Sequence, residues 1–264
     1  MKSFLEMAKG EILKILEKEK LLDKQVKVTT KVLTPKEAIG NPDRDDFPLL
    51  KGKERMIQAE TLGAIGHAFS DHIGRLSGTI KSVLSLVPEN NFHRAAQVGT
   101  INAICRALSL ENKTIHCKDK EPGLCSKELI LYLTERYPNV KKIIMIGLQP
   151  AMAEAISKKY ELKILDLDRD NIGKKRFSTI IMDGEKDLDE VLKDDYDLAL
   201  VTGSAVVNNS IDGIARRIPK GKVLYFGVTI SGVAALLKLP RYCPLSHWLN
   251  PSNPGNKTRS VIFA

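Results

Sequence analysis

Helical and extended hydrophobic patterns follow one another along the first part of the chain. Residues 1–20 bring apolar side chains to one helical face, which predicts a helix packed on a core. These side chains are Leu5, Ala8, Ile12 and Ile15. Residues 25–33, QVKVTTKVL, alternate apolar and polar positions as a half-buried strand does. Residues 34–50 are rich in loop-forming residues, with room for one short helical turn, and residues 54–63 predict a second strand.

The chain is then predicted to turn and to enter a long helix. Gly63 and Gly66 permit a sharp change of backbone direction. Residues 77–87, SGTIKSVLSLV, fit either a strand or a helix. Residues 91–109 predict a helix that is rich in small residues. Its apolar positions are Ala96, Val98, Ile101 and Ile104. This mixture of strands and helices predicts an α+β domain over residues 1–112.

After residue 113 short apolar runs alternate with amphipathic segments. Strands are predicted at residues 140–147, 161–168, 176–184, 196–203 and 222–228. Helices are predicted at residues 150–160, 208–218 and 231–239. Strands that alternate with helices through short links predict a parallel sheet covered on both faces. The expected fold class is therefore α/β, with the N-terminal α+β domain followed at residues 113–264 by a Rossmann-like domain whose sheet is mostly parallel.

The loop after the first strand of this sheet reads Gly147-Leu148-Gln149-Pro150. Open parallel sheets bind ligands at the carboxyl ends of their strands, so these residues are candidate ligand contacts. A dinucleotide loop needs G-x-G-x-x-G, in which the glycines admit the pyrophosphate. Here Gln149 takes the place of the second glycine, and Pro150 removes a backbone donor. The loop therefore argues against ordinary NAD binding, while Gly147, Gln149 and Pro150 stay candidates for another ligand.

Two carboxylates follow the second strand, in LDLDRDN at residues 165–171. Neighbours in a strand alternate sides, so one of Asp166 and Asp168 is expected to face the cleft. A carboxylate at this position often accepts hydrogen bonds from ribose hydroxyls. A solvated turn would explain the pair equally well.

Small polar residues follow the strand at residues 196–203. Thr202, Gly203 and Ser204 leave that strand together, and Asn208 and Asn209 precede the next helix. Hydroxyl and amide groups with exposed N–H groups can cradle an anion or a carbonyl. We expect a ligand at this turn, because open α/β sheets bind ligands there. The alternative is a well-capped turn without a ligand, with Asn208, Asn209 and Ser210 supplying the cap.

Four soft donors raise the question of a metal site. Cys117 and Cys125 are spaced as C-x7-C, which is not the C-x2-C of a zinc knuckle. Cys243 and His247 would complete a Cys3His set that suits zinc, if the two loops converge. A disulfide between Cys117 and Cys125 is a second possibility, mainly in a hyperthermophile.

The simplest interpretation of the cysteines is a free thiol at each position, with Ser126 capping a helix that begins after Cys125. Cys105 is expected in the core. Near the Gly63–Gly66 turn, His67, Asp71 and Glu60 could do acid–base work or form a polar loop.

The chain has 264 residues and a formal net charge of +9. Acids are scattered among the bases and aromatic residues are only 5%, so we do not expect a nucleic-acid partner. The N-terminus lacks the features of a signal peptide and no apolar run is long enough for a membrane span, so a cytoplasmic protein is expected. The expected partner is a small molecule or a metal, and the sequence leaves open whether the chain forms a homo-oligomer.

Three segments resemble the putative heavy-metal chelation family, a domain family of unknown function. They are DLALVTGSAVVNNSID at residues 197–212, AAQVGTINAICRAL at 95–108, which carries Asn102, and IIMIGLQPAMAEAI at 143–156. The resemblance implies a domain similar to the enolase N-terminal fold, a Rossmann-like domain and a site between them. It carries over Gly147, Pro150, Thr202, Gly203 and Asn208 or Asn209. The segment HCKDKEPGLC corresponds to none of the family motifs, so the resemblance says nothing for a cysteine site.

The expected function is therefore binding of a small anionic ligand, a metal or a metal chelate in a cleft between the two domains. An enzyme that uses S-adenosylmethionine or a nucleotide is the alternative, and an acid at residue 166 or 168 that holds a ribose would favour it. The sequence does not decide whether a reaction is catalysed or which metal, zinc included, would bind.

Overall fold

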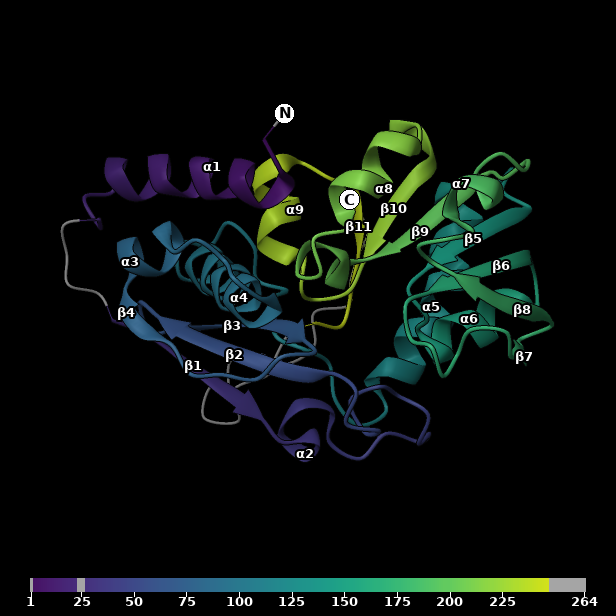
Figure 1. The fold of residues 1–264 in the computed structure, drawn as a ribbon, viewed down its shortest axis with the longest axis horizontal. Helices are drawn as coiled ribbons and strands as arrows, with labels where there is room; N and C mark the ends of the chain where they lie inside the picture. The colour runs from purple at the N-terminus through teal and green to yellow at the C-terminus, as the bar shows by residue number, and fades with distance from the viewer. Residues whose placement is uncertain (1, 23–26, 247–264) are drawn as a thin grey trace.

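A computed structural model describes residues 2–22 and 27–246 of the chain. Two sheets organise this part of the molecule, and one long helix lies between them (Figure 1). The first sheet has the strand order β3-β2-β1-β4 and the second the order β11-β10-β9-β5-β6-β8-β7. The predicted boundary near residue 112 falls between the two sheets. The division into two domains that fold on their own stays a prediction.

The first sheet is antiparallel and carries one helix on its face. Its strands are β1 (Lys27–Leu33), β2 (Arg55–Thr61), β3 (Ala64–Ser70) and β4 (Ser77–Thr79). The helices of this part are α1 (Phe4–Lys18), α2 (Pro35–Ile39), α3 (Ile80–Ser85) and α4 (Asn91–Ala107). Helix α4 packs on β2 and β3, and on its other side it contacts α1 and α9 (Ser231–Leu237). Because it is covered on all sides, α4 buries residues all round its circumference.

The second sheet is parallel except for one edge strand. Its strands are β5 (Lys142–Ile146), β6 (Glu161–Asp166), β7 (Lys175–Arg176), β8 (Thr179–Asp183), β9 (Leu198–Thr202), β10 (Val223–Phe226) and β11 (Arg241–Tyr242), with β7 antiparallel to β8. The helices are α5 (Glu121–Arg136), α6 (Pro150–Ser157), α7 (Leu188–Val191), the 3-10 turn η1 (Gly203–Val206), α8 (Ile211–Arg217), the 3-10 turn η2 (Lys220–Lys222) and α9.

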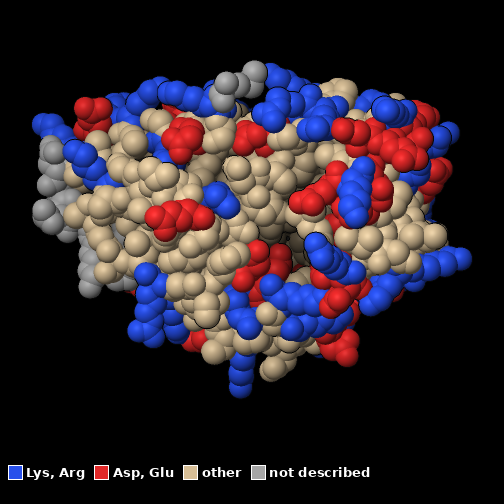
Figure 2. Space-filling view, in the orientation of Figure 1, with Lys and Arg blue, Asp and Glu red and all other residues tan. Residues whose placement is uncertain are grey.

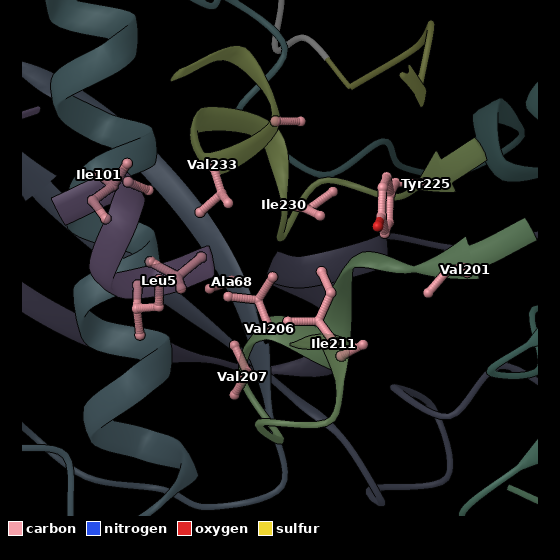
Figure 3. Close-up of a cluster of buried hydrophobic side chains, with 14 of the residues drawn as sticks. Leu5, Ala68, Ile101, Val201, Val206, Val207, Ile211, Tyr225, Ile230 and Val233 are labelled. Carbon is pink, nitrogen blue, oxygen red and sulfur yellow. The ribbon is translucent and has the colours of Figure 1, made fainter. Parts of the chain in front are cut away.

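Alternate side chains of the central strands pack into two different cores. Ile143 and Met145 of β5 point to the face covered by α5 and α6, whereas Ile144 and Ile146 point to the face covered by α1, α4, α8 and α9. A strand buried on both faces needs an unbroken apolar run, which is what residues 143–146 supply. The core that contains Ile144 and Ile146 joins the two halves of the chain. Figure 3 shows Leu5 and Ile101 of the first half in one cluster with Val206 and Val233 of the second.

Most predicted elements are present, and three predictions are wrong in detail. Gly66 does not turn the chain but lies inside β3, and the turn is made by Leu62 and Gly63, both with positive φ. Helix α5 begins at Glu121, so Cys125 lies within it. Ser126 does not cap that helix, because its Oγ donates to the carbonyl of Gly123 at 2.7 Å. The ambiguous residues 77–87 divide into strand β4 and helix α3.

Candidate functional site

A pocket of about 1140 Å³ opens at the carboxyl edge of the second sheet. Strand β5 has β6 on one side and β9, which the chain reaches from β8, on the other. The strand order therefore reverses at β5, and a crevice forms between the loops after β5 and β9. The first half of the chain supplies the opposite wall from residues 47–54 and from the end of β3. In Figure 2 the surface is hollowed between the two parts, and acidic side chains border the hollow.

Every predicted ligand-binding residue lines this pocket: Gly147, Gln149, Pro150, Asp166, Asp168, Thr202, Gly203, Ser204, Asn208 and Asn209. Whether they contact a ligand stays a prediction. The sequence also predicts that residues near Gly63–Gly66 close over the turn after β9, but neither glycine is among the lining residues in the described part of the chain. Their place is taken by Phe69, Ser70 and Asp71 at the other end of β3.

Close backbone packing fixes the loops that follow β5 and β9. Gly147 has φ +88, and a Cβ there would lie 2.4 Å from Cγ2 of Thr202. A Cβ on Gly203 would lie 2.8 Å from the backbone nitrogen of Ile230. Both positions therefore require glycine, because the loops after β5, β9 and β10 meet there. Gln149 has a structural part as well, since its Oε1 accepts the N–H of Met152 at 2.5 Å and caps α6.

The turn after β9 is capped differently from the prediction. Thr202 Oγ1 accepts the N–H of Ser204 at 3.4 Å, and the chain enters the 3-10 turn η1 at once. Asn208 Oδ1 accepts both the N–H and the hydroxyl of Ser210, at 3.1 and 2.7 Å. Ser210 makes no side-chain cap of α8, and Asn209 has a left-handed φ of +65. Helix α8 has only 7 residues, so its dipole contributes little to anion binding at this turn.

Carboxylates from both parts of the chain gather in the pocket. Asp166 accepts the N–H groups of Leu167 and Asp168 at 2.7 and 3.3 Å and the side chain of Asn171 at 2.9 Å. Three of its lone pairs are thus already used, and burial raises its pKa. Asp168 is held by Lys53, whose Nζ lies 2.7 and 2.8 Å from its two oxygens. Only one of the two acids was expected to face the cleft, but both line the pocket, because β6 ends at Asp166 and the loop that follows lies at the same edge. Neither carboxylate is free of protein partners.

Glu54 is a pocket residue that the sequence did not single out. Its carboxylate has no hydrogen-bond or ion-pair partner among the described residues, although Lys53 beside it pairs with Asp168 and Asp170. Burial, together with the negative charges of Asp166, Asp71 and Asp168, raises the pKa of Glu54 to about 7. The raised pKa of a carboxyl group beside other carboxylates indicates that the negative charge of the pocket is not neutralised by nearby cations.

Ion pairs tie the wall made by residues 47–54, and the residues just before it, to the second half of the chain. Besides the Lys53 pair, Arg44 reaches Glu154 of α6 at 2.5 Å and Asp46 at 2.7 Å. Asp46 is also 2.6 Å from the guanidinium of Arg176 in β7. These partly exposed pairs form a network, which orients the wall better than an isolated surface pair would.

Three of the four predicted metal ligands come together in the pocket. Cys117, Cys125 and Cys243 all line it, whereas His247 lies outside the described residues. All four cysteines of the chain are free, as the simplest interpretation of the sequence has it, and the alternative of a disulfide between Cys117 and Cys125 is not formed. Burial raises the pKa of Cys117 and Cys125, and the neighbouring thiol of Cys243 adds to both shifts. Within residues 2–22 and 27–246, no three His, Cys, Asp or Glu side chains are already arranged to hold a metal ion.

Cys117, Cys125 and Cys243 form the thiol wall of the pocket. Two histidines adjoin it, and they differ in whether a ring nitrogen is available to a ligand. His67 is buried, its Nδ1 accepts the N–H of His116 at 3.1 Å, and its Nε2 lies 3.3 Å from Oε1 of Gln58. Burial lowers its pKa to about 3, so it stays neutral and serves the packing. His116 lines the pocket, and burial lowers its pKa to about 4. His67 could be picked out from the sequence as an acid–base candidate, whereas His116 was not among the predicted ligands, because the loop that positions it is fixed only by long-range contacts.

Asn102 in the middle of α4 fixes the pocket loop after β10. Its Nδ2 donates to the carbonyls of His67, Thr229 and Val228 at 2.8, 3.1 and 3.3 Å. Its Oδ1 accepts the N–H of Gly232 at 2.7 Å. The amide is fully buried and fully satisfied, so it joins β3 to the loop that carries Val228 and Thr229 into the pocket wall.

Comparison with known proteins agrees with this architecture. A family model, DUF364, described as "Putative heavy-metal chelation", matches residues 129–240. A search of curated proteins found no match. No described helix is long and apolar enough to cross a membrane.

Two solved structures are similar to the chain. One is a DUF364-family protein of unknown function from Pyrococcus horikoshii, with a TM-score of 0.52 and 17% identity, covering 86% of this chain and 80% of that one. Another is a DUF364-family protein of unknown function from Desulfitobacterium hafniense, with a TM-score of 0.49 and 10% identity, covering 69% and 72%. The first shows that the fold is shared, which confirms the predicted fold class. Residues 129–240 match the DUF364 family, and the resemblance predicted from the sequence is thereby confirmed for that part of the chain.

Proposed function

We propose that this protein binds a metal ion that is already held in a complex with a small organic chelator. The observation that carries the proposal is the composition of the pocket, which combines an acidic wall, a thiol wall and a volume of about 1140 Å³. The family description, putative heavy-metal chelation, points in the same direction. The proposed activity is binding alone, without a catalytic step.

The charge of the pocket favours a ligand with a cationic centre. Among the described residues that line the pocket, seven are acidic: Glu54, Asp71, Asp166, Asp168, Asp170, Glu185 and Asp212. Three are basic: Lys53, Arg216 and Arg217. The whole chain has a formal net charge of +9, so the charge of the pocket is opposite in sign to the net charge of the chain. A wholly anionic ligand, which the sequence left open, would meet repulsion at Glu54 and its neighbours.

The size of the pocket and the arrangement of its donors favour a complex over a bare ion. A structural ion site has three or four protein ligands around one point, and no such group exists among the described residues. A chelator supplies most of the donor atoms itself, so one or two protein atoms can complete the coordination. The hydroxyl and amide groups of Thr202, Ser204 and Asn208, with Arg216 on the same pocket, suit the carboxylates of such a chelator.

The alternative, an enzyme that uses S-adenosylmethionine, keeps one supporting feature. Asp166 ends the strand next to β5, where a ribose is held in Rossmann-like folds. Its carboxylate already accepts three hydrogen bonds, however, and Asp168 is bonded to Lys53. Calorimetry with S-adenosylmethionine decides this point, and saturable binding that Asp166→Ala weakens tenfold would favour the enzyme.

Calorimetric titration with Zn2+ and Ni2+, each alone and as its citrate or histidine complex, tests the proposal. We expect at least one complex to bind 1:1 and about tenfold more tightly than the bare ion, which is about 1.4 kcal/mol. A cation beside Glu54 stabilises its ionised form and lowers its pKa from about 7, so binding at pH 7 should release protons. Buffers with different ionisation enthalpies measure that release.

Glu54→Gln should remove the proton release and weaken binding about tenfold, because it removes a negative charge from the pocket. The matched control is Glu60→Gln at the other end of β2, which is exposed and is not a lining residue. Equal affinity for the bare ion and for every complex, or binding of none of them, would overturn the proposal.

A further inference from the structure

We infer that Nε2 of His116 is the protein atom that coordinates the metal of the bound complex. This inference rests on the proposed function and adds to it the identity of the protein ligand. Of the histidines in the described part of the chain, only His116 lines the pocket. It stands between the thiol wall and β3, next to Cys117 in the sequence.

The contacts of the ring leave Nε2 as the nitrogen with a lone pair. Nδ1 lies 3.1 Å from the carbonyl oxygen of Ala38, and a carbonyl can only accept, so Nδ1 carries the proton. The backbone of Cys117 also interacts with the ring, but Nδ1 is the ring nitrogen with a hydrogen bond among the described residues. His116 lines the pocket, and we place its Nε2 at the pocket surface.

The same contacts hold the ring in one orientation. Phe69 packs edge-on against it, with the ring centroids 5.3 Å apart and the planes at 89°. The backbone N–H of His116 donates to Nδ1 of His67 at 3.1 Å, which fixes the loop beneath the ring. Metal-binding histidines commonly donate the other ring N–H to a backbone carbonyl or carboxylate, as His116 does to Ala38.

The neighbours of His116 select the class of metal. Cys117, Cys125 and Cys243 line the same pocket. Imidazole nitrogen with sulfur nearby suits zinc, nickel, cobalt or copper, whereas magnesium and calcium prefer oxygen. His67 and His72 are less suitable, since His67 uses both ring nitrogens and Nδ1 of His72 is 2.8 Å from Asp71.

Long-range 1H–15N NMR of histidine-labelled protein tests the inference with Zn2+–citrate, whose chelator contains no nitrogen. In the free protein we expect His116 as the Nδ1–H tautomer. Zn2+–citrate should move its Nε2 resonance to the position of a metal-bound nitrogen and leave Nδ1 protonated. This readout uses the unaltered chain, so it does not depend on how well a variant folds.

A variant pair gives the second readout. His116→Asn keeps a donor near the position of Nδ1 and removes Nε2, so it should bind Zn2+–citrate at least tenfold more weakly. His93→Asn on α4, outside the pocket, should bind as the unaltered protein does. If Zn2+–citrate binds while the Nε2 resonance of His116 stays in place, the inference is wrong and the proposed function stands. If Zn2+–citrate and the other complexes all fail to bind, both are wrong.

Discussion

Gly66→Ala should destabilise the protein by about 3 kcal/mol or more, at the upper end of the range for overpacked sites. A Cβ on Gly66 would lie 2.2 Å from the carbonyl oxygen of Gly99 and 2.3 Å from the nitrogen of Ala103. Both are backbone atoms of α4, so no side chain can move aside to make room. The helix itself would have to shift away from β3. Denaturant unfolding followed by circular dichroism measures the loss.

Gly63→Ala is the matched control for this change. Gly63 has φ +71 in the turn before β3, and nothing lies within 4 Å of the position of its Cβ. Only backbone strain applies there, so we expect a cost of about 1 kcal/mol. If Gly66→Ala costs no more than Gly63→Ala, α4 does not pack on β3 as closely as described.

Asn102→Ala should destabilise the protein by about 3 kcal/mol, because it leaves several buried backbone groups without partners. The amide of Gly232 and the carbonyl of His67 would lose their bonds to the side chain, at 2.7 and 2.8 Å. The loop after β10 would then be held less firmly, and Val228 and Thr229 of that loop line the pocket. Ligand binding should therefore weaken together with stability.

Thr100→Val provides the control on the same helix. The Thr100 hydroxyl is buried, but it bonds only the carbonyl of Ala96 one turn earlier, so its loss should cost about 1 kcal/mol. Hydrogen exchange gives a local measurement, in which the amide of Gly232 should exchange faster in Asn102→Ala and not in Thr100→Val. Unchanged protection of Gly232 in Asn102→Ala would show that the side chain does not hold this loop.

The fold could be predicted where periodicity and strand order decide the structure. Residues 143–146 are apolar throughout because β5 is buried on both faces, and that run is visible in the sequence. Gly66 was misread, since a glycine in a turn and a glycine beneath a helix look alike until the partner helix is known. The start of α5 was missed because Lys120 makes no side-chain cap that the sequence could reveal.

Some residues of the candidate site could be predicted from the sequence, and others could not. The loops after β5 and β9 could be predicted to line a pocket, because parallel strands bring their carboxyl ends to one edge. Glu54 and His116 could not be found in this way. Glu54 reaches the pocket from the first half of the chain, through the contact of residues 47–54 with the second sheet. His116 is positioned by its bond to Ala38 of that first half. A local pattern contains no record of such long-range pairings.

The most direct test of the central claim is the position of the metal in crystals grown with the tightest-binding complex. Anomalous diffraction at the absorption edge of that metal locates it without reference to the protein ligands. We expect one strong peak inside the pocket, within bonding distance of Nε2 of His116, with density for the chelator extending toward Thr202 and Ser204. A peak elsewhere on the chain, or a metal in the pocket held by three or more protein side chains without a chelator, would contradict it.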